Sequence, residues 1–278
     1  MMKKLLLILL CLPMIGFGQN VNIPDANFKA CLVGNTLINT NGDTEIQVSE
    51  ASAFVGDIQC QSLNISDLTG IEAFTTLTYL NCGYNQLTTL DVSGATALYQ
   101  LSCGDNQLTS LDVSNNTYLT SLYCSYNQLT SLNVSGATAL TRLYCQSNQL
   151  TSLDVSGATA LIELDCTFNQ LASLDVRNGN NTNMGFWDDL YWIFGPTMYG
   201  NPLTCVNIDD SVYCTANWDN TFNYSTNCPP PLTIQEHTTN KELLKVTDLL
   251  GRETKGTKNE VLFYIYDDGT VEKKIVLE

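Results

Sequence analysis

The sequence contains a single histidine, His237, and few basic residues. Its 278 residues include 12 lysines and arginines against 28 aspartates and glutamates, a net charge of −16 at pH 7. With one histidine near the end, a Ser-His-Asp triad, a Cys-His pair and a histidine-bound metal are excluded from the rest of the chain. Residues 19–231 hold only Lys29, Arg142 and Arg177 against 19 acidic residues. Such a chain repels phosphate backbones, which excludes nucleic acid as a partner.

Long apolar runs are also missing, apart from one at the start of the chain. The apolar run at residues 5–12 is too short to span a bilayer. Two lysines precede it, and Gly-Phe-Gly at residues 16–18 supplies small residues before a cleavage site. We therefore expect residues 1–18 to be a secretory signal peptide. We expect no transmembrane segment in the mature chain, whose 10 basic and 28 acidic residues give a net charge of −18.

What the sequence has instead is a 21-residue repeat, present five times between Leu77 and Asn181. Its common frame is L-x-x-L-x-C-x-x-N-x-L-x-x-L-x-V. The second leucine and the cysteine stand two residues apart, which is the period of a strand with one buried face. The asparagine follows where the chain turns, and its side chain can satisfy backbone groups inside the coil. The frame predicts stacked coils that form a parallel sheet and share one core.

This frame closely resembles that of the leucine-rich-repeat family. The resemblance implies an α/β solenoid with a parallel β-sheet on its concave face. We expect a helical cap before the array and a small β domain after it. The expected segments are an N-terminal cap with an irregular first coil at 19–76, the repeats at 77–181, a C-terminal cap at 182–228, a proline linker at 229–231 and a β domain at 232–278.

The 11 cysteines fall into groups with different expected roles. Five occupy a core position of the repeat that leucine usually fills in this family, so we interpret them as free, buried and apolar. These are Cys82, Cys103, Cys124, Cys145 and Cys166. Five others lie in the caps, where an exported solenoid needs its ends closed, and disulfides are plausible there. The cap cysteines are Cys31, Cys60, Cys205, Cys214 and Cys228.

The strand positions that do not point inward differ between repeats, although the frame is nearly copied. Five strands at a spacing of about 4.8 Å span roughly 20–25 Å, enough for a peptide, a glycan or one face of a domain. Aromatic and arginine side chains there suit a protein or carbohydrate partner. The alternative is that these positions face solvent and vary between repeats without any functional role. The candidate partner-binding residues are Tyr79, Asn81, Tyr84, Gln100, Asp105, Tyr123, Tyr126, Arg142, Tyr144, Glu163, Asp165 and Phe168.

The segment NTNGDTEIQVSE, which begins at residue 39, has the spacing of an EF-hand calcium loop, and a helix is expected after it. Asparagine at the first position and threonine at the sixth depart from that pattern. The alternative is a turn that caps the next helix. Calcium is therefore a candidate ligand, although no cofactor is required. The candidate ligands are Asn39, Asn41, Asp43, the carbonyl of Glu45, Gln47 and Glu50.

Two further features of the repeat region allow a functional and a structural interpretation. A column of acidic side chains could bind cations, but stacked like charges repel. We favour solvated carboxylates that accept local backbone hydrogen bonds. The column is Asp91, Asp112, Asn133, Asp154 and Asp175. The aromatic segment at 186–200 could stack on sugars, but an array end must be covered, so we favour a cap.

The composition changes after the three prolines at 229–231. The segment KVTDLLGRET, the predicted hairpin LFYIYDDG with its Asp268-Gly269 turn, and a lysine-rich final strand resemble the C-terminal sorting domain of type IX secretion substrates. The resemblance implies passage through the type IX secretion machinery. It places the protein outside, secreted or on the outer surface of a Gram-negative bacterium. The alternative is a small terminal β domain with no address function.

No catalytic constellation stands out, so we assign no catalytic residues and predict that the chain is not an enzyme. The expected function is a secreted or cell-surface binding and adhesion scaffold that recognises a protein or glycan through its concave face. One alternative is an accessory or catalytic protein that acts on polysaccharide through paired carboxylates, such as Asp188 and Asp189. Another is a structural surface-layer component.

Overall fold

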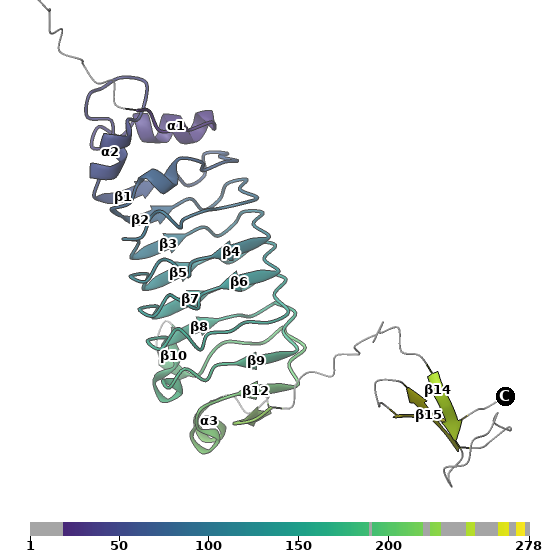
Figure 1. Ribbon diagram of the computed structural model, residues 1–278. Coiled ribbons are helices and arrows are strands. Elements are labelled where there is room, and N and C mark those ends of the chain that lie inside the picture. Colours follow the sequence, from purple (N-terminus) through teal and green to yellow (C-terminus); the bar gives the residue numbers. More distant parts are fainter. Residues whose placement is uncertain are drawn as a thin grey trace, which may run out of the picture. The chain divides into compact units, whose positions relative to one another are not determined.

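The computed structural model describes residues 19–188, 191–218, 223–228, 243–247, 261–266 and 271–275. The chain divides into two compact units, Met1–Pro231 and Leu232–Glu278. The first is a solenoid of stacked coils and the second is a small sheet (Figure 1). The signal peptide expected at 1–18 and the linker expected at 229–231 lie outside the described residues.

The solenoid is built along a parallel six-stranded sheet, called here the long sheet, in the order β1-β2-β3-β5-β7-β8. Each repeat contributes one strand, and its second leucine pairs in register with the same leucine of the next coil. This is the parallel sheet that the repeat frame predicts. Its strands are β1 (Gly56–Gln59), β2 (Leu77–Asn81), β3 (Gln100–Ser102), β5 (Ser121–Tyr123), β7 (Arg142–Tyr144) and β8 (Glu163–Asp165).

A second row of short strands lies on the other side of the coils (Figure 1). Strand β4 (Ser110–Asp112) pairs with β6 (Ser131–Asn133), and β9 (Ser173–Asp175) pairs with β12 (Cys205–Asn207). Strand β13 (Tyr224–Ser225) extends the latter pair. In each repeat, the segment on the side opposite the long sheet is thus a short strand or a turn. Helical turns flank the five repeats at η1 (Ile71–Ala73) and η2 (Asn181–Asn183). The result is a β-solenoid of about seven turns with the leucine-rich-repeat fold.

The frame leucines and cysteines lie between the two rows of strands, in one continuous core. The five repeat cysteines are free and buried, as predicted. Burial raises the pKa of the Cys103 thiol to about 12, so it stays protonated at neutral pH and packs as an apolar group. Two disulfides close the caps, one between Cys31 and Cys60 and one between Cys205 and Cys228. Cys214 is free and buried.

The N-terminal cap consists of two short helices, α1 (Ala26–Val33) and α2 (Val48–Ala53), as the sequence predicts. The carboxylate of Asp25 caps α1, because its Oδ1 accepts hydrogen bonds from the N–H groups of Asn27 and Phe28. Its Oδ2 accepts from the backbone and the hydroxyl of Ser66, which lies in the first coil. One side chain therefore both starts the helix and ties it to the array.

The array continues for one coil more than the five-repeat frame predicts. Met198 takes the place of the repeat cysteine, and Asn201 takes the place of the repeat asparagine. The Asn201 Nδ2 donates to the carbonyls of Cys166 and Met198 at 2.9 and 2.8 Å, and its Oδ1 accepts from Leu171 at 3.0 Å. The hairpin β10 (Gly185–Asp188) and β11 (Tyr191–Phe194) is inserted before this coil. The insertion breaks the 21-residue spacing, which is why the frame misses the coil.

The aromatic segment at 186–200 is therefore more than a cap. Its first part forms the β10–β11 hairpin, whose side chains lie outside the described residues. Its last part, around Met198, is core of the sixth coil. The helix α3 (Ser211–Asn217) and the Cys205–Cys228 disulfide follow that coil and close the solenoid.

The repeat asparagines form a second buried ladder, beside the cysteines. In Asn127 the Nδ2 donates to the carbonyls of Cys103 and Cys124 at 3.0 and 3.1 Å. Its Oδ1 accepts from the N–H of Leu108 at 3.0 Å. Two of these three partners belong to the preceding coil, so each asparagine closes its own turn and joins it to the coil before.

The second unit is an antiparallel sheet of β14 (Leu243–Thr247), β15 (Val261–Tyr266) and β16 (Val271–Ile275), in that order. The antiparallel pairing of β15 and β16 matches the predicted hairpin. The Asp268-Gly269 turn itself lies outside the described residues. Among the helices that the structure describes, none has the length and apolar character needed to span a membrane.

Replacing Asn127 by alanine tests the asparagine ladder. The substitution leaves the Leu108 N–H without its acceptor and removes donors to buried carbonyls, so we expect a loss of about 2–4 kcal/mol in the free energy of unfolding. Urea denaturation followed by circular dichroism measures it. Asn115→Ala, at an exposed position of the preceding coil, is the matched control and should change stability by less than about 0.5 kcal/mol. Equal stability of the two variants would contradict the role of the ladder.

Candidate functional site

The long sheet presents two columns of outward side chains. Inward leucines alternate with these positions along each strand. One column contains Tyr79, Gln100, Ser121, Arg142 and Glu163, in register. The other contains Asn81, Ser102, Tyr123, Tyr144 and Asp165. The structure therefore brings the strand residues of the predicted site together on one surface.

Four of these residues make a connected cluster, called here the platform: Tyr123, Arg142, Tyr144 and Glu163. The rings of Tyr123 and Tyr144 are stacked, with centroids 5.1 Å apart and planes 6° from parallel. The hydroxyl of Tyr144 donates to Oε2 of Glu163 at 2.5 Å, and Nε of Arg142 donates to Oε1 at 3.2 Å. A single carboxylate thus orients one ring and the guanidinium.

Glu163 differs from its prediction as a solvent-facing contact residue, because it is only 7% exposed. It lies on β8, next to the inserted hairpin, where the Gly185 N–H donates to the Ile162 carbonyl at 2.8 Å. A buried carboxylate needs partners, and Arg142 and Tyr144 supply them. Glu163 therefore positions Arg142 and Tyr144 from the neighbouring strand, with Arg142 exposed and Tyr144 half-buried.

The same contacts raise the pKa values of Tyr144 and Arg142. Burial raises the pKa of Tyr144, and the hydrogen bond to Glu163 and its negative charge raise it further. The charge of Glu163 also raises the pKa of Arg142. At neutral pH the platform thus presents a neutral phenol and a guanidinium whose side chain is 45% exposed. It offers a cation and two rings on a chain that is otherwise strongly acidic.

The remaining outward residues of the long sheet include Asn81 and Asp165, which make hydrogen bonds to nearby residues. Asn81 Oδ1 accepts from the Gly83 N–H at 3.2 Å, and its Nδ2 donates to Gln59 at 3.4 Å. Asp165 Oδ1 accepts from the backbone and the hydroxyl of Thr167. Tyr79 and Gln100 lie in register on the first two repeat strands. These residues flank the platform without joining its hydrogen-bonded cluster.

Four predicted site residues lie beyond the strands, in a turn at the end of the long sheet, and this corrects their assignment to its face. We call this line of turns the turn edge. Its members have left-handed backbones with φ between 53° and 56°: Tyr84, Asp105, Tyr126, Ser147 and Phe168. For bulky residues this conformation is unusual and costs roughly 1–3 kcal/mol each. The residue types give no signal of it, since tyrosine and phenylalanine do not favour left-handed turns.

The predicted calcium loop brings three of its six candidate ligands together. The Asn41 side-chain amide bridges Oδ2 of Asp43 at 2.9 Å and Oε1 of Gln47 at 2.7 Å, and Gln47 also donates to Asp43 at 2.9 Å. Hydrogen bonds, the largest from the Glu45 backbone, lower the pKa of Asp43. Asn41, Asp43 and Gln47 thus form one hydrogen-bonded group, in which both side-chain amides donate to the Asp43 carboxylate.

The other candidate ligands have different roles. Asn39 is buried and donates to the Val33 and Asp43 carbonyls. The Glu45 carboxylate pairs with Lys29, with 2.5 Å between Oε1 and Nζ. Glu50 accepts from Thr40, Asn41 and Gln47, as the turn interpretation requires. Burial raises the pKa of Glu50, but these hydrogen bonds outweigh it and leave the pKa lowered.

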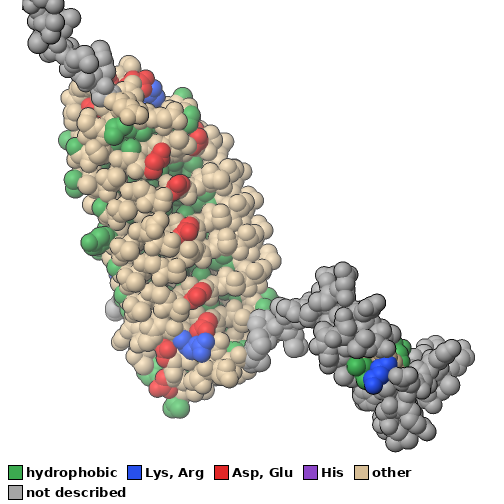
Figure 2. Space-filling view, viewed as in Figure 1, with side chains coloured by type: hydrophobic (Ala, Val, Ile, Leu, Met, Phe, Trp, Pro, Cys, Tyr) green, Lys and Arg blue, Asp and Glu red, His purple; other side chains and the backbone are tan. Residues whose placement is uncertain are grey.

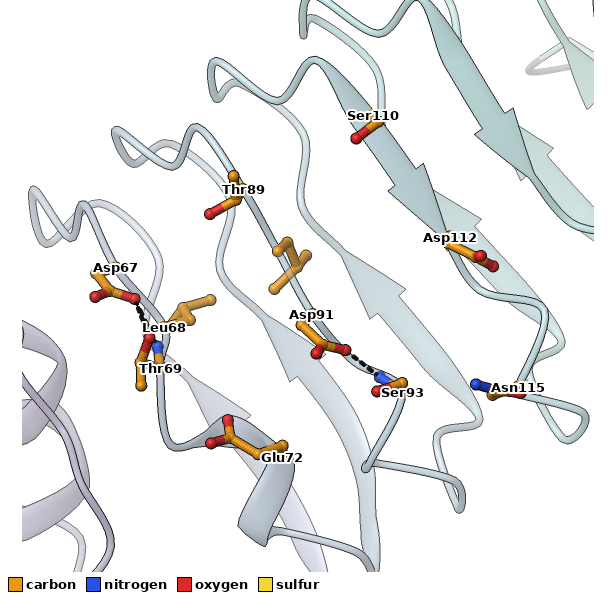
Figure 3. A pocket seen from close by; sticks show the side chains of 11 residues that line it. Asp67, Leu68, Thr69, Glu72, Thr89, Asp91, Ser93, Ser110, Asp112 and Asn115 are labelled. Atoms are coloured by element: carbon orange, nitrogen blue, oxygen red, sulfur yellow. Dashed lines mark hydrogen bonds between the residues drawn. The ribbon is translucent and has the colours of Figure 1, made fainter.

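Acidic side chains form a line along the face of the solenoid that Figure 2 shows. In the predicted acidic column every member accepts a hydrogen bond from the backbone N–H two residues later, which confirms the structural interpretation. Hydrogen bonds from Ser93 lower the pKa of Asp91, so it stays charged. The column borders a hollow of about 460 Å³ that sequence reasoning missed (Figure 3). Its acidic lining residues are Asp67, Glu72, Asp91 and Asp112.

The paired-carboxylate alternative rests on Asp188 and Asp189, which lie in the sequence of the inserted hairpin. Only the backbone of Asp188 is described, and Asp189 lies outside the described residues.

No family model matches the sequence. A stretch of 83 residues, 29% of this chain, is 46% identical to Internalin J of Listeria monocytogenes serotype 4b, but it spans only 9% of that protein. A solved internalin of Listeria monocytogenes aligns over 76% of this chain and 74% of its own, with 19% identity and a TM-score of 0.50. The solved functional domain of Internalin J, which includes a cysteine ladder, aligns over 74% of this chain and 70% of its own, with 22% identity and a TM-score of 0.28. The chain therefore shares the leucine-rich-repeat solenoid fold of that solved internalin.

Proposed function

We propose that the protein is a binding and adhesion scaffold that acts outside the cell and recognises a protein partner through the platform. The observation that carries this proposal is the preorganisation of the platform by Glu163, which holds a tyrosine pair and an arginine in place before any partner arrives. Preorganised side chains lose little entropy on binding. Similarity to an internalin supports the same role, since internalin-like leucine-rich-repeat proteins are typically surface binding scaffolds.

The chemistry of the platform indicates what the partner presents. Tyrosine and arginine are the side chains that most often dominate protein interfaces. The Arg142 guanidinium is a fork that matches a carboxylate, and the stacked rings offer a flat apolar surface beside it. The complementary surface is therefore a loop or strand with an apolar side chain next to an acidic one.

Alanine substitution of either platform tyrosine tests this proposal. A screen of the full chain against cell-surface proteins and glycans identifies the partner, and surface plasmon resonance measures Kd. We expect Tyr123→Ala and Tyr144→Ala each to weaken binding about tenfold or more, because each removes half of the stacked pair. Tyr118→Ala is the matched control, since Tyr118 is 69% exposed but lies off the long sheet. If all three variants bind the partner equally well, the platform is not the recognition site.

We also propose that the second unit directs export. Its three antiparallel strands carry the segments that resemble a type IX sorting domain, and the apolar run at 5–12 resembles a signal for passage across the inner membrane. Together they support a protein that is released from, or held on, the outer surface of a Gram-negative bacterium.

Fusion of residues 232–278 to a periplasmic reporter tests this role. In a bacterium with type IX machinery we expect the fusion to reach the surface or the medium, and a strain without the machinery should retain it in the periplasm. The chain shortened to residues 1–231 should likewise stay periplasmic. Surface delivery of that shortened chain would contradict an address function for the tail.

We further propose that the loop at 39–50 binds calcium through Asn41, Asp43 and Gln47. These side chains already meet, and hydrogen bonding keeps Asp43 charged at neutral pH. The single carboxylate among the three makes the site weak, because calcium affinity grows with the number of charged ligands.

Thermal unfolding with and without calcium tests this site. At a calcium concentration about 100 times Kd, binding stabilises the folded state by about 2.7 kcal/mol, so the melting temperature should rise. Asp43→Asn should abolish that rise, whereas Asp67→Asn should keep it, because Asp67 accepts similar local hydrogen bonds outside the loop. Glu50→Gln is less informative, since Glu50 also caps α2. A calcium response that survives in Asp43→Asn would rule out this ligand set.

A further inference from the structure

The turn edge carries an aromatic side chain in every second coil. Tyr84, Tyr126 and Phe168 come from the first, third and fifth repeats, and they are 67%, 56% and 55% exposed. Asp105 and Ser147 occupy the same position in the repeats between them. The edge thus alternates rings with small polar side chains, while the core positions beside it are nearly copied from repeat to repeat.

Backbone hydrogen bonds fix the spacing of these side chains. The N–H groups of Tyr84, Asp105 and Tyr126 donate to the carbonyls of the following coil, each at 3.0 Å. The turn edge therefore continues the ladder of the long sheet, with about 4.8 Å between neighbouring coils. Rings in alternate coils then recur every ~10 Å along a rigid line.

The rings occupy a backbone conformation that does not suit them. Glycine, asparagine and aspartate adopt left-handed φ most readily. The chain uses a small residue at the two ends of the edge, namely Ser62 in the coil before the first repeat and Gly200 in the coil after the fifth, with φ of 58° and 73°. In the middle, tyrosine and phenylalanine take its place although their side chains face solvent. These rings keep more than half of their surface exposed, so burial offsets their conformational cost only in part.

The far end of the edge is shaped as a two-ring surface. The rings of Phe168 and Tyr199 are edge to face, with centroids 5.1 Å apart, and Tyr199 is 59% exposed. A Cβ on Gly200 would lie 2.6 Å from Cδ1 of Phe168, so glycine there leaves room for the ring. The fold accommodates an exposed ring at this point.

We propose that the turn edge binds a neutral, β-1,4-linked polysaccharide in an extended conformation. In such a chain every second sugar presents the same apolar face, which matches rings that recur in every second coil. Asp105 and Ser147 lie between the rings, where their oxygens can bond sugar hydroxyls. The strong negative charge of the chain repels anionic polymers, which selects neutral ones. This inference rests on the proposed binding role, but it uses residues other than the platform.

Affinity electrophoresis of the full chain tests this inference, with hydroxyethylcellulose, xylan and glycol chitin as β-linked probes and an α-linked glucan as the comparison. We expect retardation by a β-linked polymer and none by the α-linked one. Tyr126→Asn should weaken retardation about tenfold, and its melting temperature should stay equal or rise, because asparagine tolerates left-handed φ. Tyr118→Ala and Tyr123→Ala should leave retardation unchanged.

Three results of the electrophoresis and melting measurements would overturn the inference. These are no retardation by any β-linked polymer, equal retardation by the α-linked glucan, and a lower melting temperature in Tyr126→Asn, which would make the ring a structural element. A Tyr123→Ala variant that loses a protein partner but still binds polysaccharide shows that the platform and the turn edge act separately. The two proposals can therefore fail independently of each other. A turn-edge variant that loses only a protein partner also overturns the inference.

Discussion

The structure depends on one recurring interaction, the buried asparagine that joins each coil to the coil before it. A solenoid turn leaves backbone groups facing inward, where no water can bond them. Asn127 satisfies carbonyls in two coils and the Leu108 N–H at once, and Asn201 does the same for the sixth coil. Because the donors and acceptors belong to adjacent coils, no coil can close its turn alone. Stacking is therefore built into the polar core as well as into the apolar one.

That constraint separates the chain into positions that hold the stack and positions that are free to vary. Leucine, cysteine and asparagine repeat because each coil must present the same surface to the next. Outward residues are released from that demand, so Tyr123, Arg142 and Tyr144 can form a platform without disturbing the core. The same separation explains why the cysteines are chemically quiet, since burial raises the pKa of Cys103 and its neighbours. Function on this scaffold therefore has to be sought at its surface.

Much of this arrangement follows from sequence, and the exceptions have physical reasons. The alternation of Leu80 and Cys82 predicts the strand, its buried face and the free thiols, because those features depend on local period alone. The repeat frame does not reveal the sixth coil, because Met198 replaces the cysteine and a hairpin interrupts the 21-residue spacing. The burial of Glu163 depends on its position on β8 beside that inserted hairpin. The left-handed turn of Tyr84 escapes prediction because its residue type disfavours the conformation that the stack imposes. The sequence thus predicts the contacts that each repeat makes with its neighbours. It does not predict the burial or backbone conformation that an insertion or the whole stack imposes on a residue.

The acidic side chains are placed so that repulsion between them destabilises the fold little. Unscreened carboxylates about 5 Å apart would repel one another. Each member of the acidic column accepts a backbone hydrogen bond, and Asn133 separates Asp112 from Asp154 without adding charge. Asp91 illustrates the balance, since Asp112 raises its pKa while the bonds from Ser93 lower it by more. The column lies on the side of β4 and β6, whereas the guanidinium of Arg142 lies on the long sheet. The long sheet and the column therefore differ in charge at β7, where Arg142 places a positive charge on the side of the coil away from the acidic column.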